Sequence, residues 1–151
     1  MNILFFLIPK AKVDFIKDTS TLRQTVEKMC DCGFAAIPMI NEEGIYIETI
    51  TNGDILLHLK EHSTLDLFKA EHISIKDVKI KRPTKAIKIT ANMEDLMEVA
   101  KNQNFVPVVD DTNHFIGIVT RKAIINYFED KIKEAKKGSV KSNGVLWGRQ
   151  K

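Results

Sequence analysis

Two neighbouring cations, Arg121 and Lys122, follow Thr120 where an apolar stretch gives way to a predicted helix. Positive charge in the first turn of a helix opposes the helix macrodipole, at a cost of roughly 0.3–1 kcal/mol per charge. A phosphate at the same helix end would reverse that cost, because free N–H groups and a bidentate guanidinium both favour an anion. These residues therefore predict a phosphate contact. The alternative is that both cations are solvated or paired with surface acids.

A threonine followed three residues later by an acid, Thr51 and Asp54, marks an earlier predicted helix start. The carboxylate can accept hydrogen bonds from two ribose hydroxyls, and the helix start offers free N–H groups to a phosphate. The same pair also predicts a plain capping box, in which Thr51 caps the helix and Asp54 returns the bond. The two interpretations are compatible, and both stay open.

Other reactive side chains form weaker patterns. His58 and His62 have the i, i+4 spacing of helical metal ligands, but no third ligand is apparent. Cys30 and Cys32 point to different faces of a predicted helix, so we expect reduced thiols in a cytosolic core. No Ser-His-Asp order, phosphate-binding glycine loop or zinc-ribbon spacing is present. We therefore expect no enzyme, no catalytic residues and no metal ligands.

Composition and charge limit the class of protein. A chain of 151 residues with 44% hydrophobic and 28% charged residues suits one soluble domain or two halves sharing a core. The net charge of +3 is too small to require nucleic acid. Residues 131–151 hold seven Lys and Arg against one acid, and we favour a solvated end over a polyanion contact. The apolar run at residues 2–8 is too short to span a membrane, so we expect it to pack against the rest of the protein and the protein to be cytoplasmic.

An internal repeat organises these residues. With Pro38 aligned on Pro107, the sequence YIETIT at residues 46–51 falls on FIGIVT at residues 115–120 without a gap. Each copy predicts strand, helix, strand, strand and helix. Each central strand opens near its proline, which suits a sheet edge or a strand start. A structural array without a ligand would show the same repetition.

Local signals mark the ends of the predicted elements. Two capping boxes and two left-handed turn residues are expected at Thr21 with Gln24, Asn92 with Asp95, Gly44 and Asn113. The fold class is therefore α/β, with two β-α-β-β-α repeats related by approximate two-fold symmetry. We divide the chain into repeat 1 with its lead-in (1–62), a linker (63–74), repeat 2 (75–133) and a basic tail (134–151).

The repeat resembles the CBS domain, and the tandem pair resembles a Bateman module. The strongest stretch is FVPVVDDTNHFIGIVTRKAII at residues 105–125, and the first copy matches at residues 37–40 and 51–54. The resemblance covers roughly residues 1–133. The shortened second copy and its Thr-Arg-Lys loop also resemble the small stand-alone bacterial CBS proteins that bind cyclic di-AMP.

This resemblance implies a non-catalytic regulatory module, a homodimer shaped like a flat disk, that needs no cofactor. It would bind AMP, ADP, ATP or cyclic di-AMP between the repeats and signal to an unknown partner protein, away from membranes and nucleic acid. Thr51 would contact phosphate and Asp54 ribose. The base would lie against a first strand and the strand after the helix: Lys12, Val13, Asp14, Ala35, Ala36 and Ile37 in one cleft, Phe105 and Val106 in the other.

Some residues qualify that expectation. Glu48 stands where the family and the second copy, at Gly117, have glycine, so it either faces solvent or crowds an anionic ligand. The acid missing after Thr120 implies a second site without the usual ribose contact, and hence one preferred cleft. Phe34 and Phe105 are expected in the core. Apolar residues on the closing helices suggest a further interface: Ile55, Leu56, Leu59, Ile124, Ile125 and Phe128. The alternative function is a ligand-free CBS interaction protein.

Overall fold

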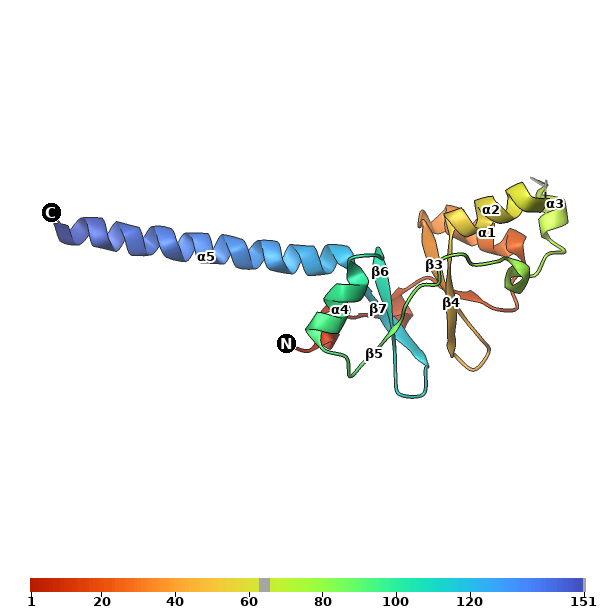
Figure 1. Cartoon of the computed structure of the whole chain (residues 1–151), viewed down its shortest axis with the longest axis horizontal. Coiled ribbons are helices and arrows are strands. Elements are labelled where there is room, and N and C mark those ends of the chain that lie inside the picture. The colour runs from red at the N-terminus through yellow and green to blue at the C-terminus, as the bar shows by residue number, and fades with distance from the viewer. Residues whose placement is uncertain (63–65, 151) are drawn as a thin grey trace.

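Two small sheets stand side by side, each covered by short helices, and one long helix projects away from them (Figure 1). The computed structural model describes residues 1–62 and 66–150, with side chains through residue 139. Repeat 1 comprises β2 (Ile16–Lys17), α1 (Leu22–Cys32), β3 (Ala36–Ile40), β4 (Tyr46–Thr51) and α2 (Asn52–His62). Repeat 2 comprises β5 (Ile87–Lys88), α4 (Met93–Ala100), β6 (Phe105–Val109), β7 (Phe115–Thr120) and α5 (Arg121–Gln150). The predicted α/β class and element order are confirmed.

The lead-in segments add short elements to both repeats. These are η1 (Ile3–Phe6), β1 (Ile8–Pro9), η2 (Lys10–Lys12), α3 (Leu67–Ala70) and η3 (Ile75–Asp77). The first strand of repeat 1 is β2, so the strand expected at residues 12–14 was misplaced. Residues 10–12 form a 3₁₀ turn instead. The helix α3 lies inside the predicted linker, of which residues 63–65 fall outside the described chain.

Within the described chain, the first sheet has the order β2-β3-β4 and the second β1-β7-β6-β5. Pro38 and Pro107 therefore lie inside inner strands, and the prediction of an edge or strand start was wrong. The sheet tolerates them because the parallel neighbours are only two residues long. The strand β2 pairs with Met39 and Ile40, and β5 pairs with residues 108–109, so each proline precedes the residues paired on that side.

Local sequence signals act as predicted. Both capping boxes form, at Thr21 with Gln24 and at Asn92 with Asp95. The hairpin residues Gly44 and Asn113 adopt φ of 84° and 66°. Glycine and asparagine tolerate this left-handed conformation, which closes each hairpin.

Each lead-in packs on the core of the other repeat. Ile3 and Phe6 are buried in the core of repeat 2, which confirms that the apolar N-terminal run packs against the protein. Ile75 and Val78 are buried in the core of repeat 1. Each repeat is therefore stabilised in part by the lead-in of the other. For this reason each hydrophobic core includes residues from both halves of the sequence.

The two hairpins join the sheets. The amide of Tyr46 donates to the carbonyl of Asn113 (3.0 Å), and the amide of Phe115 donates to the carbonyl of Gly44 (2.9 Å). The rings of Tyr46 and Phe115 stack with centroids 6.3 Å apart. These contacts fix one sheet against the other.

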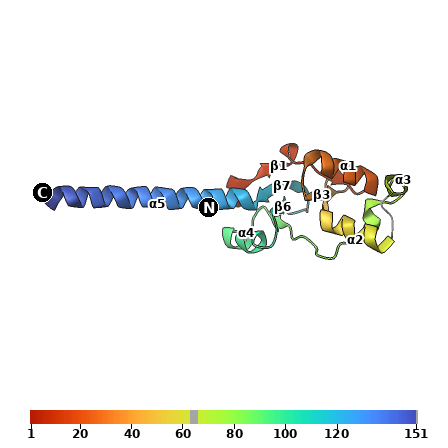
Figure 2. The ribbon, with the colours of Figure 1, turned by 90° about the horizontal axis from the view of Figure 1, so that it is seen from above.

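The helix α5 extends far beyond the sheets in two perpendicular views (Figures 1 and 2). It continues through Gln150, so the predicted boundary between residues 133 and 134 falls inside it. Every side chain from Phe128 to Ser139 is exposed, as a solvated end requires. Among the described residues, no helix is both long and apolar enough to cross a membrane.

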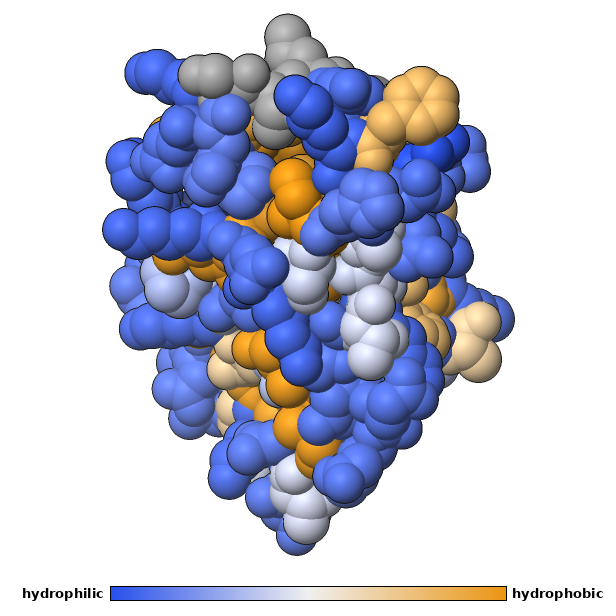
Figure 3. Space-filling view, turned by 90° about the vertical axis from the view of Figure 1, so that its right-hand side faces the viewer, coloured by the Kyte–Doolittle hydropathy of each residue, from blue (hydrophilic) through white to orange (hydrophobic). Residues whose placement is uncertain are grey.

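The face at the repeat 1 end is largely hydrophilic with small apolar patches (Figure 3). Both cysteines are free, but Cys30 is exposed and Cys32 half-buried, so the expectation of core thiols was wrong. The reason is that the core-facing side of α1 is taken by Leu22, Thr25 and Met29.

Candidate functional site

A cleft of about 1030 Å³ opens between the two repeats. Its walls come from the start of β3, the β4–α2 turn, residues 81–85, and the chain between α4 and β6. Six predicted site residues border it: Ala35, Ala36, Thr51, Asp54, Phe105 and Arg121. The structure therefore combines residues that the sequence had divided between two clefts.

Seven other predicted residues do not border this cleft: Lys12, Val13, Asp14, Ile37, Val106, Thr120 and Lys122. Ile37 and Val106 are fully buried, because side chains alternate along a strand and theirs face the two cores. Lys12 ends the turn η2, which packs against β7. The carboxylate of Asp14 pairs with Lys28 at 3.7 Å.

The three predicted site residues at the start of α5 have different surroundings. The hydroxyl of Thr120 accepts a hydrogen bond from the amide of Ala123 (3.1 Å) and so caps the helix. Lys122 is exposed and does not border the cleft, whereas Arg121 does. Only one of the two cations is thus placed to contact a ligand in the cleft.

Asp54 forms the predicted capping box with Thr51. Its Oδ2 atom accepts from the amide of Thr51 (3.0 Å) and from the Thr51 hydroxyl (2.8 Å), and its own amide donates to that hydroxyl (3.2 Å). Asp54 is only 7% exposed, so these bonds fix its rotamer. Among the described residues, Oδ1 of Asp54 has no hydrogen-bond partner. The cap and a ligand contact can therefore coexist on the two oxygens.

The guanidinium of Arg121 closes the end of α4. Its Nε donates to the carbonyl of Ala100 (2.9 Å), and its Nη2 approaches the carbonyl of Lys101 (3.4 Å). Neither solvation nor an acidic partner, the two expected alternatives, describes this arrangement. A guanidinium has five N–H donors, so donors remain for an anion in the cleft. Arg121 also borders a second, apolar groove of about 570 Å³ between α4 and α5.

Sequence inspection missed a set of cations on the cleft wall. Lys81, Arg82 and Lys85 all border the cleft and are exposed. The signal was available as the dense basic run KIKRPTK at residues 79–85, between the repeats. Of the acids that border the cleft, Glu98 accepts a hydrogen bond from Lys101 (2.8 Å), and this bond lowers the pKa of the Glu98 carboxyl group.

Glu48 does not border the cleft. It is half-buried, and its Oε1 accepts from the amides of Thr49 and Thr84, both at 2.9 Å. Neither expected role, facing solvent or crowding a ligand, matches this position. Phe105 is half-buried and borders the cleft, whereas Phe34 is 54% exposed, so its assignment to the core was wrong. Phe34 precedes β3 and therefore lies outside the alternation that buries Ile37.

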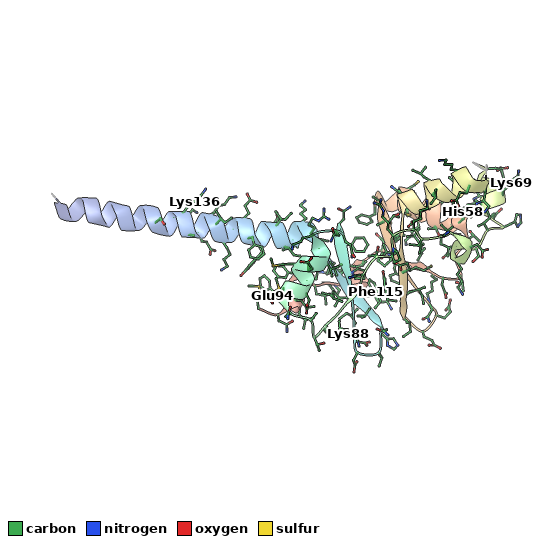
Figure 4. The ribbon with its side chains drawn as sticks, in the orientation of Figure 1. His58, Lys69, Lys88, Glu94, Phe115 and Lys136 are labelled. Carbon is green, nitrogen blue, oxygen red and sulfur yellow. The ribbon has the colours of Figure 1, made fainter. Side chains whose placement is uncertain are left out.

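The histidine pair lies on α2, away from the cleft lining (Figure 4). The rings of His58 and His62 stack at 4.0 Å, and His58 is buried with no partner for Nε2 among the described residues. Burial, and then the charge of His62, lower the pKa of His58. In the described chain, no group of three or more His, Cys, Asp or Glu side chains is placed to hold a metal.

Two repeats with exchanged lead-ins and an inter-repeat cleft define a tandem CBS architecture. The CBS domain family model matches residues 75–130, and the whole fold matches tandem CBS (Bateman) structures. Residues 75–130 therefore match the CBS domain, and the chain as a whole has a tandem CBS fold.

Among solved structures, the chain resembles CbpB. It is 25% identical to CbpB crystallised in complex with c-di-AMP, covering 91% of both chains with a TM-score of 0.80. CbpB from Streptococcus agalactiae is 26% identical, with 89% and 84% coverage and a TM-score of 0.76. An uncharacterized protein of Methanocaldococcus jannaschii is 25% identical over 134 residues, or 82% of this chain and 48% of that protein. The chain thus spans about half the length of this curated relative.

Proposed function

We propose that the protein binds an adenine nucleotide, with cyclic di-AMP as the first candidate, in the inter-repeat cleft. It then signals occupancy to a partner without catalysis, in the cytoplasm. The observation that carries this proposal is one cleft bordered by both the free Oδ1 of Asp54 and the guanidinium of Arg121. The resemblance to CbpB, which has been crystallised with c-di-AMP, supports it.

Each cleft residue has a chemical role in this proposal. Oδ1 of Asp54 accepts hydrogen bonds from ribose hydroxyls, while Oδ2 keeps the cap with Thr51. Arg121 donates its spare N–H groups to a phosphate. The small side chains of Ala35 and Ala36 let a purine approach the backbone, and Phe105 adds apolar contact area.

The position of Arg121 offers a route for the signal. A phosphate that attracts the guanidinium competes with the carbonyls of Ala100 and Lys101, which also border the apolar groove. The groove continues onto exposed apolar side chains of α5, namely Ile125 and Ile132. A second copy of the chain would cover this face, so nucleotide binding changes the geometry of a homodimer.

A calorimetric titration with AMP, ADP, ATP and cyclic di-AMP tests the proposal. Arg121→Ala should weaken binding roughly 10- to 100-fold, because a charge-assisted hydrogen bond contributes about 1.5–3 kcal/mol. Lys122→Ala is the matched control, since this neighbouring cation does not border the cleft. No heat and no thermal shift with any nucleotide would refute the proposal.

The second candidate is a ligand-free interaction protein. It is favoured by one observation, the apolar groove between α4 and α5, whose lining includes the exposed side chains of Ile125, Phe128 and Ile132. This candidate predicts dimerisation that needs no nucleotide and persists in the double variant Asp54→Ala/Arg121→Ala. Sedimentation analysis of both proteins, with and without cyclic di-AMP, separates the two functions.

A further inference from the structure

Residues 81–85, called here the strap, form one wall of the cleft yet belong to no helix or strand. Outside the helices and strands, no backbone–backbone hydrogen bond of the described chain involves residues 79–86. Three hydrogen bonds from two side chains hold the strap. The Thr84 amide donates to Glu48 Oε1 (2.9 Å), the Lys85 amide donates to Gln103 Oε1 (2.8 Å), and Gln103 Nε2 donates to the Lys85 carbonyl (3.0 Å). Glu48 belongs to repeat 1 and Gln103 to repeat 2, so each repeat supplies one of the two side chains that hold the strap.

The segment that corresponds to the strap in the first copy of the repeat includes β1 (Ile8–Pro9), and it is held differently. The strand β1 pairs with β7 through its backbone, with Pro9 opposite Gly117. A Cβ atom at Gly117 would collide with the carbonyl oxygen of Ile8, so this pairing requires glycine. Glu48 occupies the equivalent position on β4. The described chain has no fourth strand beside β4, and the Glu48 carboxylate accepts the amide of Thr84 in the strap instead.

The strap presents positive charge to the cleft. Lys81, Arg82 and Lys85 form no ion pair with any residue that the structure describes. Of the two acids that border the same cleft, Asp54 is hydrogen-bonded to Thr51 and Glu98 to Lys101. With Arg121, the cleft is therefore bordered by four cations and two acids, an excess of two positive charges. A volume of about 1030 Å³ leaves room for more than one phosphate group.

We propose that the strap is the phosphate-binding wall of the cleft and that Glu48 and Gln103 are its positioning residues. The cleft then selects ligands that carry at least two phosphate groups, such as a nucleoside di- or triphosphate or a cyclic dinucleotide. The nucleoside part of this inference rests on the proposed function. The phosphate part is independent of it, because inorganic pyrophosphate presents two phosphate groups without a base.

Two readouts on the full chain test the inference. Calorimetry compares pyrophosphate, inorganic phosphate, AMP, ATP and cyclic di-AMP as ligands, and hydrogen exchange follows the amides of Thr84 and Lys85. The variants are Lys81→Ala/Arg82→Ala, Glu48→Ala, Glu48→Gln and Gln103→Ala. Glu42→Ala is the control for a lost acid on the same hairpin. Lys79→Ala/Lys88→Ala is the control for lost cations, since neither lysine borders the cleft.

The strap predicts tighter binding of ligands with two phosphates than of AMP or phosphate. The double cation variant should weaken the former about tenfold or more, and added salt should reduce that difference. Glu48→Ala and Gln103→Ala should speed exchange at residues 84 and 85 and weaken binding, whereas Glu48→Gln, which keeps the acceptor oxygen, should stay near wild type. The two controls should change neither readout.

The outcomes distinguish the two proposals. Pyrophosphate binding that depends on the strap, without binding of any adenine nucleotide, supports the strap and refutes the proposed function. Nucleotide binding that survives the double cation variant and Glu48→Ala refutes the strap and leaves the proposed function intact. Unchanged exchange at residues 84 and 85 in Glu48→Ala overturns the positioning role. Failure of wild type to bind any of the probes refutes both proposals.

Discussion

The packing of the N-terminal lead-in on repeat 2 can be tested at Phe6, with the neighbouring Phe5 as the control. Its side chain is 7% exposed and lies in the core of repeat 2, about eighty residues away in sequence. Its ring contacts Phe5 and Tyr127 edge-to-face, with centroids 5.2 and 5.4 Å away. The adjacent Phe5 is 70% exposed and contacts the same tyrosine at 5.8 Å. The two residues therefore share an environment and differ in burial.

The expected magnitudes follow from that difference. Truncating a buried phenylalanine costs about 3–5 kcal/mol, as lost transfer energy and a cavity, so Phe6→Ala should lower the free energy of unfolding by that amount. Phe5→Ala loses only exposed area and an aromatic edge contact of about 0.5–1.5 kcal/mol. Urea unfolding followed by circular dichroism measures both, and hydrogen exchange on β6 and β7 locates the loss in repeat 2. Equal costs for the two variants, or a loss confined to repeat 1, would refute the exchanged packing.

Three further predictions concern single positions. Because burial lowers the pKa of His58, the unfolded chain binds this proton more readily, so stability should fall as pH drops below about 6.5, by at most about 1.4 kcal/mol per pH unit. His58→Gln should flatten this dependence in thermal melts from pH 7.5 to 5.5, with exposed His72→Gln as the control. Gly117→Ala should cost about 1–3 kcal/mol, because its Cβ meets the Ile8 backbone, and an unchanged melting temperature would contradict the β1 pairing. Gly138→Ala has open space and should raise the helix signal in circular dichroism by favouring α5, and a decrease would argue against a helix there.

Local sequence signals predicted most of the fold. The capping boxes at Thr21 and Asn92 and the turns at Gly44 and Asn113 depend on neighbouring residues, so one repeat suffices to recognise them. The element order followed from the same patterns. The lead-in packing was not predictable in this way, because burial of Ile3 against repeat 2 depends on which surface the folded partner leaves uncovered.

The site was harder to predict than the fold. Ala35, Thr51 and Asp54, assigned to one cleft, all border the cleft that the structure forms. Phe105 and Arg121 border it too but were assigned to another cleft, since sequence separation hides which repeat faces which. Ile37 was included because it adjoins the alanines, and alternation along β3 then buries it. Residues 81–85 carry no pattern that links them to a cleft until the fold brings them to its wall.

The difference between the repeats is concentrated at one pair of equivalent positions. At Gly117 the absence of a side chain lets β1 join the sheet, which uses the backbone groups of that lead-in. At Glu48 the described chain has no such pairing, and the amides of Thr84 and Lys85 in the strap donate to two side chains instead. A segment held by three hydrogen bonds moves more readily than a paired strand, because fewer bonds break when it shifts. The wall of the cleft that the strap forms can therefore adjust to a ligand. The difference between the repeats, already apparent in the acid missing after Thr120, thus extends to how firmly each lead-in is held.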